Sequence, residues 1–119
     1  MGKDKKDMPS EKIINKLAKK EFEKDSKITD YWFPIKSRWG LEKDIFGVFD
    51  CLIIDNLGRI TFIQLTTKPN IRARVKKIKD WINKKRINII TGAFSIEVWG
   101  WSEKEKEFKK IIINYKSLL

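Results

Sequence analysis

The stretch that decides the fold is FGVFDCLIIDNLGRITFIQLTTK, residues 46–68. It contains two apolar runs, 48–54 and 60–66, whose β-branched and aromatic content is typical of strands. The Asn-Leu-Gly triplet at 56–58 fits a three-residue hairpin loop, in which a type I turn is followed by a left-handed residue, usually glycine. The sequence therefore predicts an antiparallel hairpin.

The register of this hairpin brings polar side chains together. A three-residue loop sets Asp55 opposite Arg59, and counting outward places Asp50 directly opposite Gln64. Opposed residues point to the same face, with Cβ atoms about 4.5–5.5 Å apart, and Thr66 projects to that face too. Because this spacing suits a hard cation such as Mg²⁺, Asp50 and Gln64 are a candidate cation site. The alternative is that both are solvated residues at a strand end or edge.

Composition indicates the class of partner. The chain has 119 residues, enough for one domain with a single core. Its 27 lysines and arginines against 16 acidic residues give a net charge of +11, which favours a polyanion, either nucleic acid or an anionic membrane surface. We expect nucleic acid. A lysine-rich proteome is the alternative source of the same charge.

The missing residue types exclude several chemistries. The chain has no histidine and a single cysteine, so a zinc site of ordinary composition and a histidine-dependent nucleophile are both excluded. No glycine-rich phosphate loop is present. Cys51, inside an apolar run, is expected to be a core residue in a reducing compartment. No apolar run is long enough to span a bilayer and the first residues lack a secretion signal, so we expect a cytoplasmic protein with no membrane partner.

The first helix is predicted over 11–24, with Ser10 as its N-cap. Its apolar residues recur at steps of three and four along one stripe. Glu11 lies at the edge of this stripe and Glu21 near its centre, so either acid is a candidate to serve the site, although Glu11 also suits an exposed first turn. A strand is then predicted over 31–36, at an edge or with a bulge because of Pro34.

Two basic segments are candidates to contact phosphates. Arg38 and Trp39 lie in a loop over 37–44, where they suit either stacking on bases or capping of the core. A second helix is predicted to start after Pro69, with Asn70 as N-cap. Its exposed positions are almost all basic, which favours a phosphate-contacting surface over an ordinary solvated face. The candidates for backbone contacts are Arg38, Arg72, Arg74, Lys76 and Lys77.

The end of the chain is predicted to form a strand over 94–101 and a final helix. Ser102 and Glu105 have the spacing of a capping box at the start of that helix, and Phe108, Ile111 and Ile112 would lie on its apolar face. The passage from one strand through a helix to the next favours a parallel, right-handed crossover. We therefore predict a flexible basic N-terminus (1–9) and a single α/β domain (10–119) with one mixed sheet.

This order of elements, αβββαβ followed by a helix, resembles the PD-(D/E)XK nuclease superfamily, which includes Holliday-junction resolvases and restriction-type endonucleases. The Gly-x-x-Asp that opens the family's second strand is similar to the GVFD at residues 47–50, and its acid-x-Lys is similar to the QLT at 64–66. The likeness covers about residues 11–101. Within the superfamily, the chain resembles a small branch of uncharacterised phage and prokaryotic proteins. It implies a restriction-endonuclease-like fold and a Mg²⁺- or Mn²⁺-dependent deoxyribonuclease. Asp50 would be the main metal ligand, Gln64 the second, and Glu11 the family's first-helix acid.

The chain departs from the family pattern at two positions. Gln64 stands in place of a carboxylate, and Thr66 in place of the lysine. Under the resemblance Thr66 would orient water, and Lys68 or a lysine of the second helix, Lys76 or Lys77, would balance the phosphoryl charge. The last helix would offer a surface for a homodimer. The alternatives are a catalytically inactive nucleic-acid-binding protein of the same fold and a subunit whose basic surface meets an acidic protein.

Overall fold

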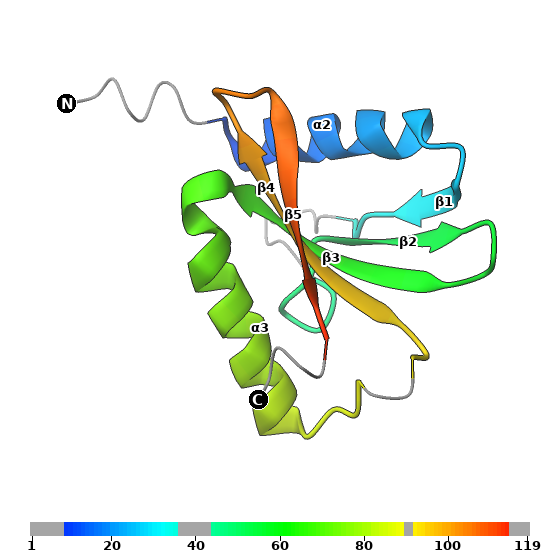
Figure 1. The fold of residues 1–119 in the computed structure, drawn as a ribbon, viewed down its shortest axis with the longest axis vertical. Coiled ribbons are helices and arrows are strands. Elements are labelled where there is room, and N and C mark those ends of the chain that lie inside the picture. Colours follow the sequence, from blue (N-terminus) through cyan, green and yellow to red (C-terminus); the bar gives the residue numbers. More distant parts are fainter. Residues whose placement is uncertain (1–8, 36–43, 90–91, 115–119) are drawn as a thin grey trace.

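The computed structural model describes residues 9–35, 44–89 and 92–114, which form an α/β domain with one five-stranded mixed sheet and a helix on each of its faces (Figure 1). The elements in chain order are α2 (Glu11–Lys24), β1 (Ile28–Trp32), β2 (Cys51–Asp55), β3 (Ile60–Thr67), the short 3-10 turn η1 (Lys68–Asn70), α3 (Ile71–Lys85), β4 (Ser95–Ser102) and β5 (Glu107–Ile113). The predicted α/β class with a mixed sheet is confirmed.

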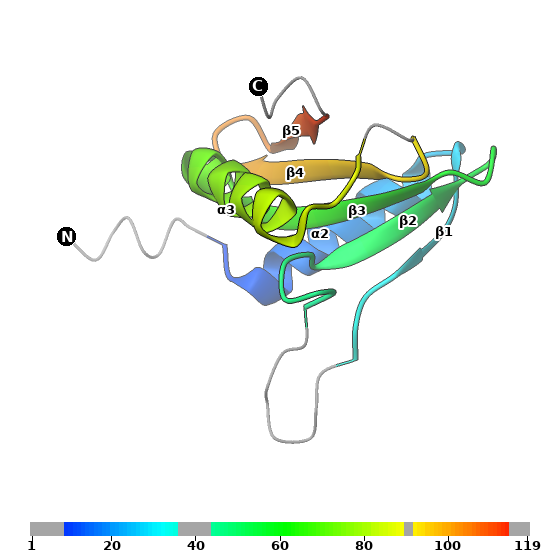
Figure 2. The same ribbon diagram turned by 90° about the horizontal axis from the view of Figure 1, so that it is seen from below.

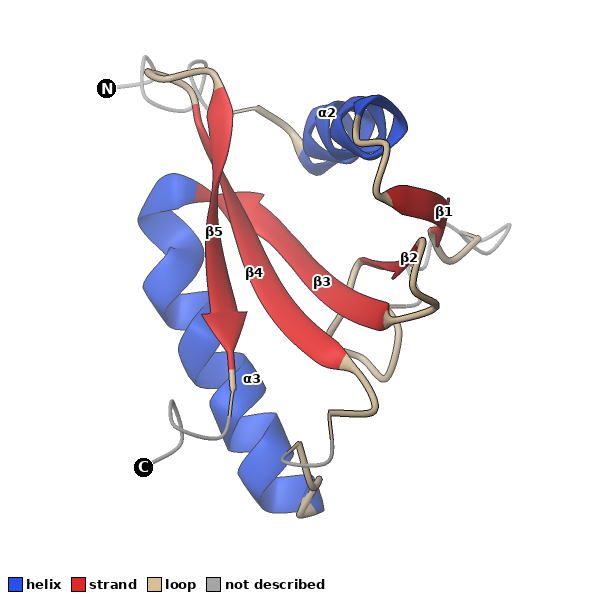
Figure 3. Ribbon diagram, turned by 45° about the vertical axis from the view of Figure 1, so that its right-hand side comes forward, coloured by secondary structure: helices blue, strands red, loops and turns tan. Residues whose placement is uncertain are grey.

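The strands lie side by side in sequence order, from β1 to β5. The first three form an antiparallel meander, β4 is parallel to β3, and β5 returns antiparallel to β4. α3 connects the two parallel strands (Figure 3). The antiparallel pairing of β2 with β3 and the parallel crossover from β3 to β4 are both as predicted from the sequence.

The central hairpin has the register counted from its loop. Cys51 pairs with Ile63, and the Asp55 backbone N–H donates to the Arg59 carbonyl at 3.0 Å. Gly58 has a φ of +78°, the left-handed conformation that glycine adopts without steric cost. The same count extends one residue beyond the strand, so Asp50 lies across from Gln64.

The two helices cover opposite faces of the sheet, and side chains alternate between them along each strand. Phe22 of α2 packs with Ile63 and Leu65, whereas Ile78 of α3 belongs to a second core with Phe62. Figure 2 shows α3 on one side of the strands and α2 on the other. Because Gln64 and Thr66 share the parity of Phe62, their side chains project to the α3 side.

The predicted final helix is wrong, because residues 107–113 form the edge strand β5. The expected contact exists, with Ser102 Oγ accepting from the Glu105 backbone N–H at 3.2 Å, but it stabilises a turn. Lys106 has a left-handed φ of +55° and its N–H donates to the Ser102 carbonyl at 2.7 Å, which closes the hairpin. Pairing with β4 and the β-branched run Ile111–Ile113 stabilise a strand instead. The predicted dimer surface on that helix is therefore lost.

Two smaller predictions are also corrected. β1 begins at Ile28 rather than 31, because its pairing with β2 starts across from Asp55, so Pro34 follows the strand. Asn70 makes no side-chain capping hydrogen bond to α3; its Nδ2 donates to Thr67 Oγ1 at 3.0 Å. The N-cap at Ser10 is confirmed, since its Oγ accepts from the Ile13 N–H at 3.3 Å.

Some predictions fall on residues outside the described ranges. These are the N-terminal segment 1–8 and the loop residues Arg38 and Trp39. Among the helices of the described part, none is long and apolar enough to cross a membrane.

Candidate functional site

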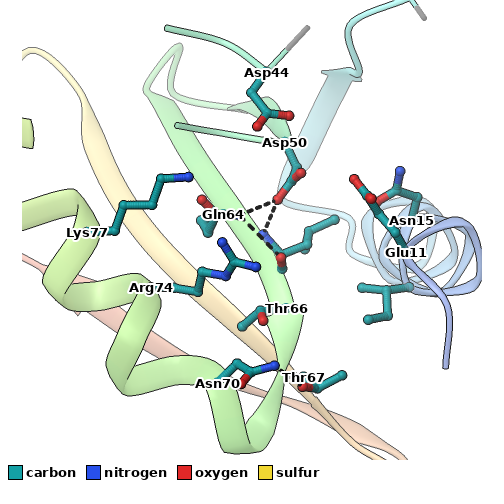
Figure 4. Close-up of a pocket in the computed structure, with 12 residues that line it drawn as sticks. Glu11, Asn15, Asp44, Asp50, Gln64, Thr66, Thr67, Asn70, Arg74 and Lys77 are labelled. Carbon is teal, nitrogen blue, oxygen red and sulfur yellow. Dashed lines mark hydrogen bonds between the residues drawn. The ribbon is translucent and has the colours of Figure 1, made fainter. Parts of the chain in front are cut away.

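A polar cavity of about 280 Å³ lies where β3 ends, between the N-terminal halves of the two helices. The end of β3 contributes its floor, the segment before β2 its upper wall, and the helices its two sides (Figure 4). The polar residues lining it are Glu11, Asn15, Asp44, Asp50, Gln64, Thr66, Thr67, Asn70, Arg74 and Lys77. In open α/β sheets, the space beyond the carboxyl ends of parallel strands is a common ligand site.

Asp50 and Gln64 are joined in this cavity, as the hairpin register predicts. Gln64 Nε2 donates to Asp50 Oδ2 at 2.8 Å, and the Leu65 backbone N–H donates to the same oxygen at 2.6 Å. The Gln64 side chain is 4 % exposed. Both residues therefore have fixed side chains, which is what a preorganised site requires.

Two of the residues that line the cavity each have a buried amide oxygen that accepts no hydrogen bond from the described residues. Considering the described residues alone, Gln64 Oε1 and Asn15 Oδ1 have no hydrogen-bond partner. A buried polar atom without a partner costs about 1–3 kcal/mol, so such atoms normally meet water or an ion. Amide and carboxylate oxygens together form the kind of ligand set that hard cations prefer.

Three acids line this cavity, one from α2 and two from the segment before β2. Glu11, predicted at the edge of the apolar stripe of the first helix, lines the cavity with Asp50 and with Asp44, which was not among the predicted site residues. Glu21, the other acid of the first helix, instead pairs with Lys110 of β5. Within residues 9–35, 44–89 and 92–114, no three acid, cysteine or histidine side chains stand close enough to form a ready-made metal cage. A cation here would therefore need the amide oxygens.

A tight loop explains why Asp44 lies near Asp50. Ile45 and Phe49 form an antiparallel bridge, with the Ile45 N–H donating to the Phe49 carbonyl at 2.8 Å. The loop between them turns through left-handed conformations at Phe46 and Gly47. Residues on the two outer sides of this bridge are thus brought together, although they are six positions apart in sequence.

Of the predicted cationic residues, Arg74 and Lys77 reach the cavity. Both side chains extend from α3 toward Gln64 (Figure 4). Lys68 does not line it, and its Nζ lies 3.3 Å from a carboxylate oxygen of Glu105. Lys76 pairs with Asp80 at 3.1 Å and, with Arg72, lines a separate groove beside Ile111. The basic helix therefore presents two faces, and only one of them meets the site.

Thr66 and Cys51 differ in what they offer to the site. Thr66 is buried and lines the cavity on the same side of β3 as Gln64. Cys51 follows Asp50 but is fully buried in the core on the α2 side. Burial, and to a lesser degree the charge of Asp50, raises the pKa of the Cys51 thiol well above its ordinary value. Cys51 is thus a core residue, as expected, and a neutral thiol rather than a nucleophile.

No family model, curated protein or solved structure matches this chain. Its chemistry must therefore be inferred from the cavity itself.

Proposed function

We propose that this protein is a divalent-cation-dependent DNA endonuclease of the PD-(D/E)XK type, with a restriction-endonuclease-like core. The observation that carries the proposal is the hydrogen-bonded pair of Asp50 and Gln64 at the end of β3, in which Gln64 Oε1 has no hydrogen-bond partner among the described residues. The helix, three-strand meander, helix and parallel strand also follow the order of that superfamily's core. The net charge of +11 suits a polyanionic substrate.

The residues of the cavity fit a Mg²⁺ or Mn²⁺ ion. Asp50 supplies the central carboxylate, Gln64 Oε1 a neutral oxygen, and Glu11 or Asp44 further negative charge from the walls. A divalent cation supplies Lewis-acid polarisation of a phosphoryl oxygen and lowers the pKa of water. An amide in place of a carboxylate removes one negative charge, so the affinity for the ion should be lower than in a two-carboxylate site.

The cationic side chains of α3 would handle the phosphate. Arg74 can bind a phosphoryl oxygen through its planar guanidinium, and Lys77 can stabilise the negative charge that develops on it. Lys77 is therefore our candidate for the role of the family's motif lysine. Lys68, paired with Glu105, is a poorer candidate for it. The Thr66 hydroxyl lies beside Gln64 and can hold a water molecule through a hydrogen bond.

A second function is favoured by one specific contact. Asp50 Oδ2 already accepts two hydrogen bonds, from Gln64 and from the Leu65 N–H, so a metal is not required to stabilise this carboxylate. A catalytically inactive protein of the same fold could keep these two hydrogen bonds to Asp50. It would bind DNA in a salt-dependent manner, with no dependence on Mg²⁺ or on the Asp50 charge.

The proposal is tested with supercoiled plasmid and four-way-junction DNA, incubated with Mg²⁺, Mn²⁺ or EDTA. Asp50→Asn is the informative variant, because asparagine keeps the size and an acceptor oxygen for the two hydrogen bonds. Mutating a residue that hydrogen-bonds to a metal ligand lowers metal affinity or activity roughly 10–100-fold. Removing the charge of the ligand itself should therefore reduce cleavage by more than that. Cleavage that is unchanged in Asp50→Asn, or that persists in EDTA, would exclude this site as its source.

A further inference from the structure

A second cavity, of about 650 Å³, lies on the α3 side of the sheet and is lined mainly by aromatic rings. Phe46 stacks on Trp81 with ring centroids 6.0 Å apart and an interplanar angle of 23°. Phe49 meets the same indole edge-on at 5.4 Å, and Phe62 and Phe94 contact each other edge-on at 5.6 Å. Lys85 adds a positive charge to this otherwise apolar lining.

Phe46 is held in an unusual position for a large apolar residue. Its side chain is 67 % exposed and its backbone has a left-handed φ of +57°. Such a conformation is unfavourable for a bulky residue and persists only where the surroundings enforce it. Here the bridge between Ile45 and Phe49 fixes the loop and sets the Phe46 ring beside Trp81. The aromatic wall is thus built before any ligand arrives.

The aromatic cavity and the proposed active site share two structural elements. On α3, Arg74 and Lys77 line the polar cavity, and Trp81 and Lys85 line the aromatic one. These positions follow one another by steps of three, four and four, so they lie along one face of the helix. The loop before β2 likewise contributes Asp44 and Asp50 to one cavity, and Phe46 and Phe49 to the other.

The spacing along this face suits a nucleic acid strand. Lys77 and Trp81 are four residues apart, about 6 Å along the helix axis, which is comparable to the reach of a single nucleotide. Along this face of α3, the cation of Lys77 is followed by the aromatic ring of Trp81 and then by the cation of Lys85. Single-stranded nucleic acids are typically bound by that combination, in which basic groups follow the phosphates and aromatic rings stack on bases.

We propose that the aromatic cavity binds an unpaired nucleobase of a DNA strand whose phosphates follow Arg74, Lys77 and Lys85. This inference rests on the proposed function, because it takes the polar cavity as the place where that strand is cut. A base within a duplex is stacked and paired and so cannot enter. The substrates that the site favours are therefore single-stranded, flapped or branched DNA rather than continuous duplex.

The experiment measures binding in EDTA, where no cleavage occurs. Two labelled oligothymidylates of equal length are compared, one intact and one in which central bases are replaced by an abasic analogue, so that their phosphate charges are equal. Stacking of a base on an aromatic side chain strengthens binding, so we expect the intact strand to bind about tenfold tighter. Phe46→Ala should remove most of this difference. Leu57→Ala, which truncates a similarly exposed side chain (72 %) at the tip of the β2–β3 hairpin, should retain it.

Thermal melting verifies that Phe46→Ala is folded, as expected for an exposed ring. Equal binding of the two oligonucleotides by the wild type, or a base-dependent difference that persists in Phe46→Ala, would overturn the inference, as would failure to bind either strand. The proposed nuclease activity fails in a different way. If binding depends on bases but no DNA is cut with any metal, the nucleobase site stands and the endonuclease does not. If DNA is cut but intact and abasic strands bind equally well, the endonuclease proposal stands and the nucleobase site does not.

Discussion

Gln64 donates its side-chain N–H to Asp50 Oδ2 at 2.8 Å, while its own oxygen, Oε1, has no hydrogen-bond partner among the described residues. One end of the amide therefore stabilises the acid, and the other end remains available to a ligand. A carboxylate at position 64 would instead repel Asp50 in the absence of a cation. In the proposed metal site, the amide avoids this repulsion in the absence of a cation, at the expense of negative charge for binding one.

Gln64→Glu should therefore make the stability of the protein depend on Mg²⁺. Without the ion, the repulsion between two opposed carboxylates should lower the melting temperature. The added charge should also raise the affinity for Mg²⁺, and we expect the variant to bind Mg²⁺ at least about tenfold tighter than the wild type, or about 1.4 kcal/mol. Melting curves over a Mg²⁺ series measure both effects. The matched control is the double variant Asp50→Asn with Gln64→Glu, which restores a single charge. Identical Mg²⁺ dependence in Gln64→Glu and wild type would mean that residue 64 does not contact the ion.

Lys77→Ala and Lys76→Ala remove the same charge from adjacent positions of α3, but only Lys77 lines the polar cavity. We expect Lys77→Ala to lower cleavage about a hundredfold, the size of effect seen when one group that stabilises transition-state charge is lost. Lys76→Ala should leave cleavage near the wild-type rate. The measurement is single-turnover cleavage at fixed salt. Equal losses in the two variants would show that only the overall charge of the helix matters.

Much of the site could be predicted because its central pair depends on local sequence. The glycine at position 58 fixes the loop, the loop fixes the register, and the register places Asp50 across from Gln64. Asp44 and Asn15 could not be found in this way. Asp44 lines the cavity because Ile45 and Phe49 form an antiparallel bridge, and no periodic pattern in the sequence predicts that bridge. Asn15 lies on the helix face beside the apolar stripe, where a polar residue looks like an ordinary surface residue.

The sequence predicts a helix in place of the final strand because Phe108, Ile111 and Ile112 have the three- and four-residue spacing of a helix face. Phe108 and Ile113 are buried while Ile111 and Ile112 are exposed, which is not a strict alternation. Contacts across the sheet decide its structure, including Phe108 against Trp101 with ring centroids 5.1 Å apart. The same limit applies to α3. Its sequence shows many cations, but only the neighbouring strands determine that Lys77 faces the cavity and Lys76 does not.

Gly100→Ala should destabilise the fold next to the site. Gly100 pairs with Thr66 across the parallel strands, and a Cβ there would lie 2.4 Å from the Ile71 side chain and 3.0 Å from the Lys68 Cα. Overpacking of this kind costs about 1–3 kcal/mol, which urea denaturation would measure. Adding Ile71→Ala should recover part of the loss, because it removes the closest clash and leaves the backbone one. If Gly100→Ala alone is neutral, the start of α3 does not pack on β4 as described.

Cys51 gives the stability of the protein a definite dependence on pH. Burial raises the pKa of its thiol in the native state, whereas the unfolded thiol ionises near pH 8.5. Above that pH the unfolded chain binds fewer protons than the native one, so stability falls as pH rises, by about 1.4 kcal/mol per unit until the native pKa is reached. Cys51→Ala lacks this contribution, while every other titrating group is shared by the two proteins. Urea denaturation under reducing conditions at pH 7 and pH 9.5 should therefore show a steeper loss for the wild type than for Cys51→Ala. Parallel losses would contradict the burial of this thiol.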